Sequence, residues 1–125
     1  MINLELANES GAVVGDAAVR DVARAVLAGE GIAEGDLGIT FVGAERMREL
    51  KREHLGIDEA TDVLSFPIDG RDALAKGMPR QLGDVVLCPQ VVGDAWRGPL
   101  VHGLLHLLGY EHGTEMERRE RIHSA

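Results

Sequence analysis

The sequence lacks the features of a secreted or membrane-bound protein. Its 125 residues include one cysteine, Cys88, so no disulfide can form within the chain. No stretch approaches the roughly 18 consecutive apolar residues of a membrane span. The opening MINLELANES also lacks the basic and then apolar pattern of a secretory signal. We therefore expect a cytoplasmic protein with no membrane partner, in which Cys88 is a small buried residue that binds no metal.

Aromatic residues and net positive charge are also missing, which limits how the chain could bind nucleic acid. Phe, Trp and Tyr make up 3% of the residues, so a surface of stacked bases is not expected. The formal net charge of −8 argues against a general phosphate-binding surface. Basic side chains gather only in residues 46–52 and 118–121, where glutamates alternate with them. Either cluster can be a nucleic-acid contact or simply a solvated helix face.

What the chain does have is a histidine-rich apolar stretch, GPLVHGLLHLLGYEHG, at residues 98–113. Pro99 stands where the first helical residue is expected, and Gly109 stands where a left-handed cap would end a helix. On such a helix, His102 and His106 differ by about 40° in azimuth and ~6 Å in rise, so they share one face.

The turn at Gly109 would bring a third histidine, His112, toward the first two. A lone histidine on an apolar helix is more often a hydrogen-bonded core residue, but burying several imidazoles without partners is costly. Three imidazoles that converge form a zinc site whose fourth position is open, as in catalytic rather than structural sites. We expect one Zn²⁺ per chain, bound by His102, His106 and His112.

Strand and helix patterns alternate along the remaining chain. Alternating apolar residues predict strands at residues 2–7, 37–43, 61–69 and 82–89. Helical periodicity predicts helices at residues 16–29, 44–55 and 114–125, with Asp16 and Thr114 as N-caps. Residues 70–81 show no clear period and are expected to form a loop. The sequence predicts a single α+β domain, residues 1–125, with one mixed sheet of about four strands and the zinc-binding helix near the C-terminus.

The histidine spacing H-x3-H-x2-G-x2-H is shared with the metzincin metalloproteases, with one residue changed. Those enzymes place a glutamate, the general base, where this chain has Gly103. A glycine inside a helix costs about 1 kcal/mol relative to alanine, which favours another element passing close to the helix there. A zinc peptidase-like hydrolase remains an alternative, without its usual base.

Three motifs in order, TDVLSFP, LGDVVLCP and HGLLHLLGYEH, together resemble the YbeY-type endoribonucleases, the bacterial rRNA maturation factors, over residues 61–112. The resemblance implies an α+β fold, zinc on the three histidines and a cytoplasmic, single-strand-directed endoribonuclease of 16S rRNA maturation and ribosome quality control. It implies as partners single-stranded RNA, such as a 16S rRNA precursor, and the ribosomal small subunit or its associated factors. A ribosome-associated binding protein with a structural zinc is the alternative from another class.

One departure concerns catalysis. Many relatives carry an arginine shortly before TDVLSFP, where this chain has Leu55. A cation must meet the charge of the phosphate, so Arg52, one helical turn earlier, and Arg97, just before the histidine helix, are the assigned candidates, with Arg80 as a third. Asp84 is the assigned base or orienting carboxylate. Asp62 and Glu111 are the other carboxylates that could take this role.

Overall fold

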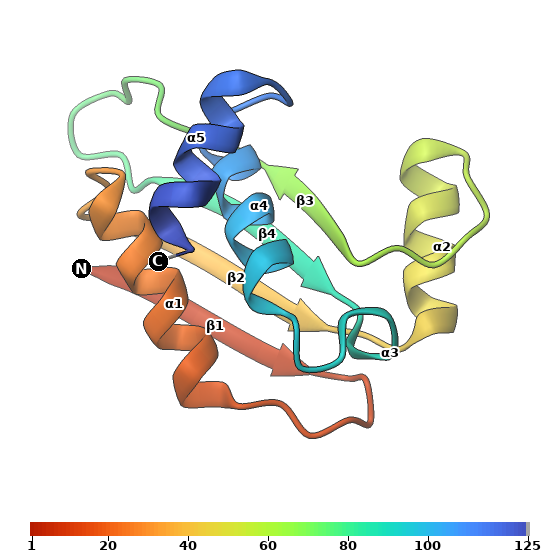
Figure 1. Cartoon of the computed structure of the whole chain (residues 1–125). Helices are drawn as coiled ribbons and strands as arrows, with labels where there is room; N and C mark the ends of the chain where they lie inside the picture. Colours follow the sequence, from red (N-terminus) through yellow and green to blue (C-terminus); the bar gives the residue numbers. More distant parts are fainter. Residues whose placement is uncertain (125) are drawn as a thin grey trace.

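The computed structural model describes residues 1–124 and shows one α+β domain built on a mixed sheet of four strands (Figure 1). The strands follow the spatial order β1-β2-β4-β3, in which β1, β2 and β4 run parallel and β3 runs antiparallel to β4. The elements in chain order are β1 (Ile2–Asn8), α1 (Asp16–Gly29), β2 (Gly35–Phe41), α2 (Ala44–Leu55), β3 (Val63–Pro67), β4 (Gln81–Leu87), α3 (Pro89–Val92), α4 (Arg97–Leu107) and α5 (Thr114–His123).

These elements confirm the predicted fold class and the mixed four-stranded sheet, with differences in detail. Helix α4 begins at Arg97, so Pro99 is its third residue and not its first as predicted. The four-residue helix α3 was not predicted. The strand β2 begins at Gly35, two residues earlier than expected. Asp16 and Thr114 are the first helical residues rather than caps, and neither α1 nor α5 has a side-chain cap. Among residues 1–124, no helix is both long and apolar enough to cross a membrane.

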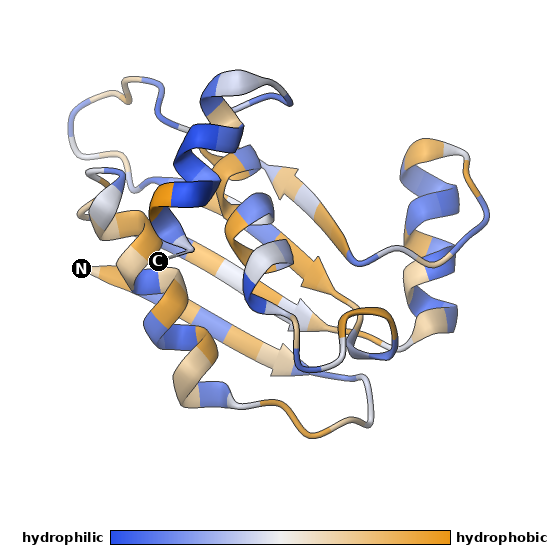
Figure 2. Cartoon of the chain, in the orientation of Figure 1, coloured by the Kyte–Doolittle hydropathy of each residue, from blue (hydrophilic) through white to orange (hydrophobic). Residues whose placement is uncertain are grey.

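Side-chain alternation along the strands produces two apolar clusters, one on each face of the sheet. Val63 and Val85 point to the face covered by α1 and α4, where the larger cluster lies. Their neighbours Leu64 and Val86 point to the opposite face and pack in a smaller cluster with Met47 of α2. Figure 2 shows the apolar strands between helices whose outer faces are polar. The sheet is therefore buried on both sides where α2 and α4 cover it.

Cys88 follows β4 directly and belongs to the smaller cluster. Its side chain is fully buried, which confirms the predicted packing role. His102 and His106 belong to α4, and His112 follows it, so all three histidines lie on the face of the sheet opposite this cluster.

The histidine helix α4 lies against β3 and β4 and is buried on most of its surface. A Cβ atom at Gly103 would come within 2.9 Å of Val85 Cγ1 and 3.0 Å of Val63 Cγ2. The helix can approach the sheet this closely only because residue 103 has no side chain. The expectation that another element passes close to the helix at Gly103 is confirmed. β3 is one of the two edge strands, and Pro67 is its last residue, as its sequence predicted.

Candidate metal centre and its cavity

A glycine-centred turn brings the third histidine back toward α4. Gly109 has the left-handed φ of 97°. Its N–H donates to the His106 carbonyl at 3.0 Å, and the N–H of Tyr110 donates to the Leu105 carbonyl at 3.1 Å. These two bonds form a Schellman motif, which satisfies the last helical carbonyls while reversing the chain. His112 therefore reaches the rings of α4 within six residues of His106.

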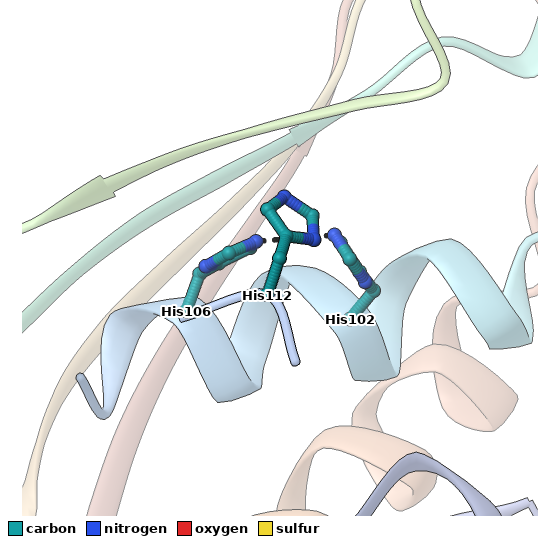
Figure 3. Close-up of side chains that lie close together, drawn as sticks. All are labelled: His102, His106 and His112. Carbon is teal, nitrogen blue, oxygen red and sulfur yellow. Dashed lines mark hydrogen bonds between the residues drawn. The ribbon is translucent and has the colours of Figure 1, made fainter. Parts of the chain in front are cut away.

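The three imidazoles converge on one point (Figure 3), with ring centroids 4.6 Å apart for His102 and His106, 4.7 Å for His106 and His112, and 5.1 Å for His102 and His112. Ring nitrogens of His102, His106 and His112 all lie within 4.8 Å of one another. The Nε2 atoms of His102 and His106 are 3.1 Å apart. Zinc bound tetrahedrally at about 2.1 Å holds its nitrogen ligands about 3.4 Å apart, so small side-chain movements suffice to fit the ion. The donor set, three imidazoles with no fourth protein ligand among the described residues, suits a zinc site with an open position.

Hydrogen bonds to the outer ring nitrogens orient two of the three imidazoles. Nδ1 of His106 donates to the backbone carbonyl of Tyr110 at 2.9 Å, because a carbonyl can only accept. Nδ1 of His102 lies 3.3 Å from Oε1 of Glu120, a carboxylate on α5. Both contacts leave Nε2 as the nitrogen that carries a lone pair toward the other rings.

Burial also favours the neutral ring that a metal requires. Desolvation, and then the charge of His102, lower the pKa of His106 below its usual value of 6.5. The hydrogen bond to Tyr110 opposes this shift in part. The pKa of His106 therefore favours a deprotonated ligand over most of the physiological range.

The histidines line a cavity of about 1000 Å³ that follows the free edge of β3. Its walls come from the end of α2, from β3 and the residues after it, from α4, and from the turn that leads to α5. His54 and Leu55 close the end formed by α2, where the His54 ring packs edge-on against Phe66 with ring centroids 4.8 Å apart.

The cavity is acidic. Among the described residues that line it, none is arginine or lysine, whereas five are carboxylates: Asp62, Asp69, Asp72, Glu111 and Glu120. A phosphate entering this cavity would meet negative side chains unless a bound cation were present.

The three assigned catalytic residues do not line this cavity. Asp84 alternates with Val85, which faces α4, so its carboxylate lies on the opposite face of the sheet, over Gly38. Arg52 is an exposed residue of α2, and Arg97 is the exposed first residue of α4. The structure thus leaves Arg52, Asp84 and Arg97 outside the cavity lining and places Asp84 on the face of the sheet opposite the histidines.

The secondary candidates divide into two groups. Arg80 is used by its own loop, because its guanidinium donates to the carbonyls of Gly70 at 2.6 Å and Asp72 at 3.0 Å. Asp62 lines the cavity, but its Oδ1 accepts a hydrogen bond from the N–H of Val63 at 2.8 Å, as a strand-end turn residue does. Glu111 lines the cavity and is exposed.

Sequence reasoning missed Glu120 and His54. The signal for Glu120 was its position four residues after Met116, which is buried, since both then lie on the face of α5 that packs on α4. The signal for His54 was its place beside Leu55, the position already noted as unusual.

Comparison with known proteins agrees with this geometry. The family model described as endoribonuclease YbeY matches residues 6–124. The chain belongs to the YbeY family. Endoribonuclease YbeY of Salinispora tropica is 40% identical, with 95% of this chain and 88% of the relative covered. Endoribonuclease YbeY of Micrococcus luteus is also 40% identical, with 94% and 83% covered. A Thermotoga maritima protein known from its solution structure shares the fold at a TM-score of 0.60 and 24% identity, over 98% of this chain and 86% of that one.

The YbeY family match spans the whole of the site. It includes the end of α2 with His54, the edge strand β3, the three histidines and Glu120. All residues that line the cavity therefore lie within the part of the chain that the family model matches.

Proposed function

We propose that this chain is a zinc-dependent endoribonuclease that cuts single-stranded RNA. The observation that carries the proposal is the convergence of three histidine nitrogens within 4.8 Å, on the wall of a large cavity in a chain of the YbeY family. The names of the relatives state an endoribonuclease, and the open ligand position agrees with a catalytic metal.

His102, His106 and His112 would hold one zinc ion through their inner nitrogens. When bound, zinc supplies Lewis-acid chemistry by polarising a phosphate oxygen or activating a water molecule. Glu111, exposed in the cavity beside His112, can accept a proton at its carboxylate. Tyr110 supports this arrangement by holding the His106 ring through its carbonyl.

The shape and charge of the cavity favour a short unpaired stretch of RNA. A volume of about 1000 Å³ is at the upper end of the ~300–1000 Å³ usual for ligand pockets. Unpaired nucleotides can turn their bases into such a cavity, whereas paired bases cannot. His54 and Phe66 offer ring surfaces at one end, and the imidazole can donate a hydrogen bond to phosphate.

The proposed biological role follows from the family resemblance. We place the protein in the cytoplasm, where it would act on a 16S rRNA precursor with the ribosomal small subunit or its associated factors. This role would serve 16S rRNA maturation and ribosome quality control.

One observation favours a second function, a ribosome-associated binding protein in which zinc only stabilises the fold. None of the described cavity-lining residues is arginine or lysine, and the arginine seen in many relatives is replaced by Leu55. The third function, a zinc peptidase-like hydrolase, is disfavoured because no side chain can be placed at residue 103 without contacting the sheet.

A cleavage assay separates these functions. Zinc content is measured first, and the protein is then incubated with end-labelled single-stranded RNA, the matching duplex and a peptide substrate, each with and without chelator. We expect cleavage of the single strand alone, lost with chelator and in His106→Ala. If the parent carries one zinc per chain and leaves RNA intact, the nuclease proposal fails and the binding function replaces it. Cleavage of the peptide alone would support the hydrolase.

A further inference from the structure

A buried carboxylate, Glu30, lies at the C-terminal end of α1, outside the cavity. Its side chain is 1% exposed, and it is the one charged or polar residue in the buried class among residues 1–124. Four side chains bind it. Its two oxygens accept hydrogen bonds from Arg71 at 2.6 Å, Tyr110 at 2.7 Å, His123 at 2.7 Å and Arg119, which binds through Nε at 2.8 Å and also through Nη2.

These partners come from three segments that surround the metal centre. Arg71 belongs to the loop after β3, two of whose neighbouring residues line the cavity. Tyr110 belongs to the turn between the second and third histidines. Arg119 and His123 belong to α5, which also carries Glu120. Glu30 therefore binds all three segments. One carries His112, one forms a wall of the cavity, and one carries Glu120, the carboxylate beside His102.

The backbone next to Glu30 is shaped for this contact. A Cβ at Gly29 would lie 2.7 Å from Cε1 of His123, so the His123 ring occupies space that a side chain at residue 29 would take. Arg71 also donates to the Glu30 carbonyl at 2.7 Å and lies over the Tyr110 ring, with Cζ 5.5 Å from its centroid.

Tyr110 links this cluster to a metal ligand directly. Its hydroxyl donates to Glu30 at 2.7 Å, and its backbone carbonyl accepts from Nδ1 of His106 at 2.9 Å. Tyr110 is thus held at both ends, and the orientation of its carbonyl sets the ring plane and the tautomer of His106.

We propose that Glu30 is a positioning residue for the metal centre, acting through Tyr110 on His106 and through Arg119 on α5 and Glu120. It touches neither the ligand nitrogens nor the cavity. The proposal rests on the proposed function only in that the three histidines bind a metal.

A purely structural role for Glu30 makes a different prediction. If Glu30 only joins α1 to α5, its loss lowers the stability of the domain, and metal affinity changes no more than in any equally destabilised variant. If it positions the ligands, metal affinity and the His106 tautomer change beyond that level. Outer partners of zinc-bound histidines typically contribute 10–100-fold to metal affinity.

The test uses Glu30→Gln, Tyr110→Phe and a control, Val19→Ala. Val19 is fully buried on the same helix, about three turns from Glu30. Zinc affinity is measured by competition with a chromophoric chelator, and the His106 tautomer by ¹⁵N NMR of the metal-free protein. We expect zinc affinity to fall about 10-fold or more in Glu30→Gln and severalfold in Tyr110→Phe. Both variants should lose population of the Nδ1–H form of His106, and Val19→Ala should change neither quantity.

Equal zinc affinity in Glu30→Gln, Tyr110→Phe and Val19→Ala, with the tautomer unchanged, would overturn the proposal. If Glu30→Gln does not fold, Tyr110→Phe decides the matter, because it removes one hydroxyl and no charge. The NMR measurement needs neither metal nor RNA, so failure of the nuclease proposal leaves this test intact. Conversely, a parent that cuts RNA while these variants keep full zinc affinity would retain the function and refute the role of Glu30.

Discussion

The Ser65 hydroxyl donates a hydrogen bond of 3.0 Å to the backbone carbonyl of Gly103, which joins the edge strand β3 to the middle of α4. A Cβ on Gly103 would lie 3.1 Å from the same hydroxyl oxygen. Residue 103 stands between His102 and His106, so the separation of helix and strand at this point sets how the two rings face the β3 edge. Glycine is needed here for packing and not for backbone conformation, since its φ is not positive.

We predict that Gly103→Ala destabilises the protein despite the higher helix propensity of alanine. The propensity gain is about 1 kcal/mol, whereas forcing a methyl group into a packed interface costs typically 1–3 kcal/mol. Gly98→Ala, also in α4 but facing open space, is the matched control and should not destabilise. Chemical denaturation measures both. A Gly103→Ala protein as stable as Gly98→Ala would mean that α4 and the sheet adjust without cost.

We predict one zinc per chain in the purified protein and its loss in His106→Ala, which leaves two ligands. His54→Ala is the control, because His54 lies in the same cavity but outside the histidine cluster. It should keep one zinc. Elemental analysis after dialysis gives the result, and full metal content in His106→Ala would place the site elsewhere.

Zinc occupancy in the parent should also fall as the pH drops through about 6, because protonated imidazoles do not bind metal. The lowered pKa of His106 moves its protonation to lower pH than that of an ordinary histidine. Retention of the metal at pH 5 would count against ligation by histidine.

The convergence of His102, His106 and His112 could be predicted from the sequence because its geometry is local. A spacing of four residues places His102 and His106 on one face of any helix, and Gly109 marks where the helix ends and the chain turns. The fold class followed in the same way, from apolar periodicity within each segment. None of these inferences depends on how distant segments pack.

The residues around the ligands depend on that packing, and here the sequence was insufficient. Whether Asp84 or Val85 faces α4 is decided by which face of β4 the helix covers, and a strand pattern apolar on both faces does not reveal it. Glu120 reaches His102 only because α5 docks on α4. From the sequence alone, Glu30 would be predicted to be an exposed residue at the end of a helix. Its four partners lie 41–93 residues away along the chain, so no local pattern reveals them.

We predict that His54, rather than Arg52, contributes to RNA binding. His54 lines the cavity and packs against Phe66, whereas the exposed Arg52 of the same helix does not line it. Loss of one stacked ring costs ~1–3 kcal/mol in binding, so His54→Ala should raise KM for single-stranded RNA about 5-fold or more. Arg52→Ala should change it little, and both variants should keep their zinc.

His54→Phe separates the two contributions of the imidazole. If it restores the KM, the ring surface is what RNA needs; if it does not, the N–H donor is required. A fall in turnover of about 100-fold in Arg52→Ala would instead support Arg52 as the cation that stabilises the transition state.

We predict that Cys88→Ala keeps both its zinc and its activity, at a stability cost of about 1 kcal/mol. Cys88 is fully buried in the cluster beneath α2, so the substitution leaves a small cavity there and does not reach the histidines. Denaturation and elemental analysis of the variant test this directly. Loss of zinc would show that the thiol is a ligand after all.

The last prediction concerns the pH dependence of stability that Glu30 confers. Burial alone would raise the pKa of its carboxyl, but hydrogen bonds from His123, Tyr110 and Arg119, together with the charge of Arg119, lower the pKa from 4.5 to about 2. A carboxyl with a lowered pKa stabilises the folded state above its unfolded pKa, and this contribution is lost as the pH falls toward the folded pKa. The shift corresponds to at most about 3 kcal/mol.

The parent should therefore lose more stability than Glu30→Gln as the pH falls from about 6 to about 2.5, because glutamine does not titrate. The difference in unfolding free energy between the two proteins, measured by urea denaturation, should be largest near neutral pH and shrink through the range of carboxylate titration. Other acidic groups are common to both proteins and cancel in this difference. A difference that stays constant with pH would mean that the Glu30 carboxyl has the same pKa in the folded and the unfolded protein, so that its contacts with Arg71 and Arg119 do not favour the ionised form.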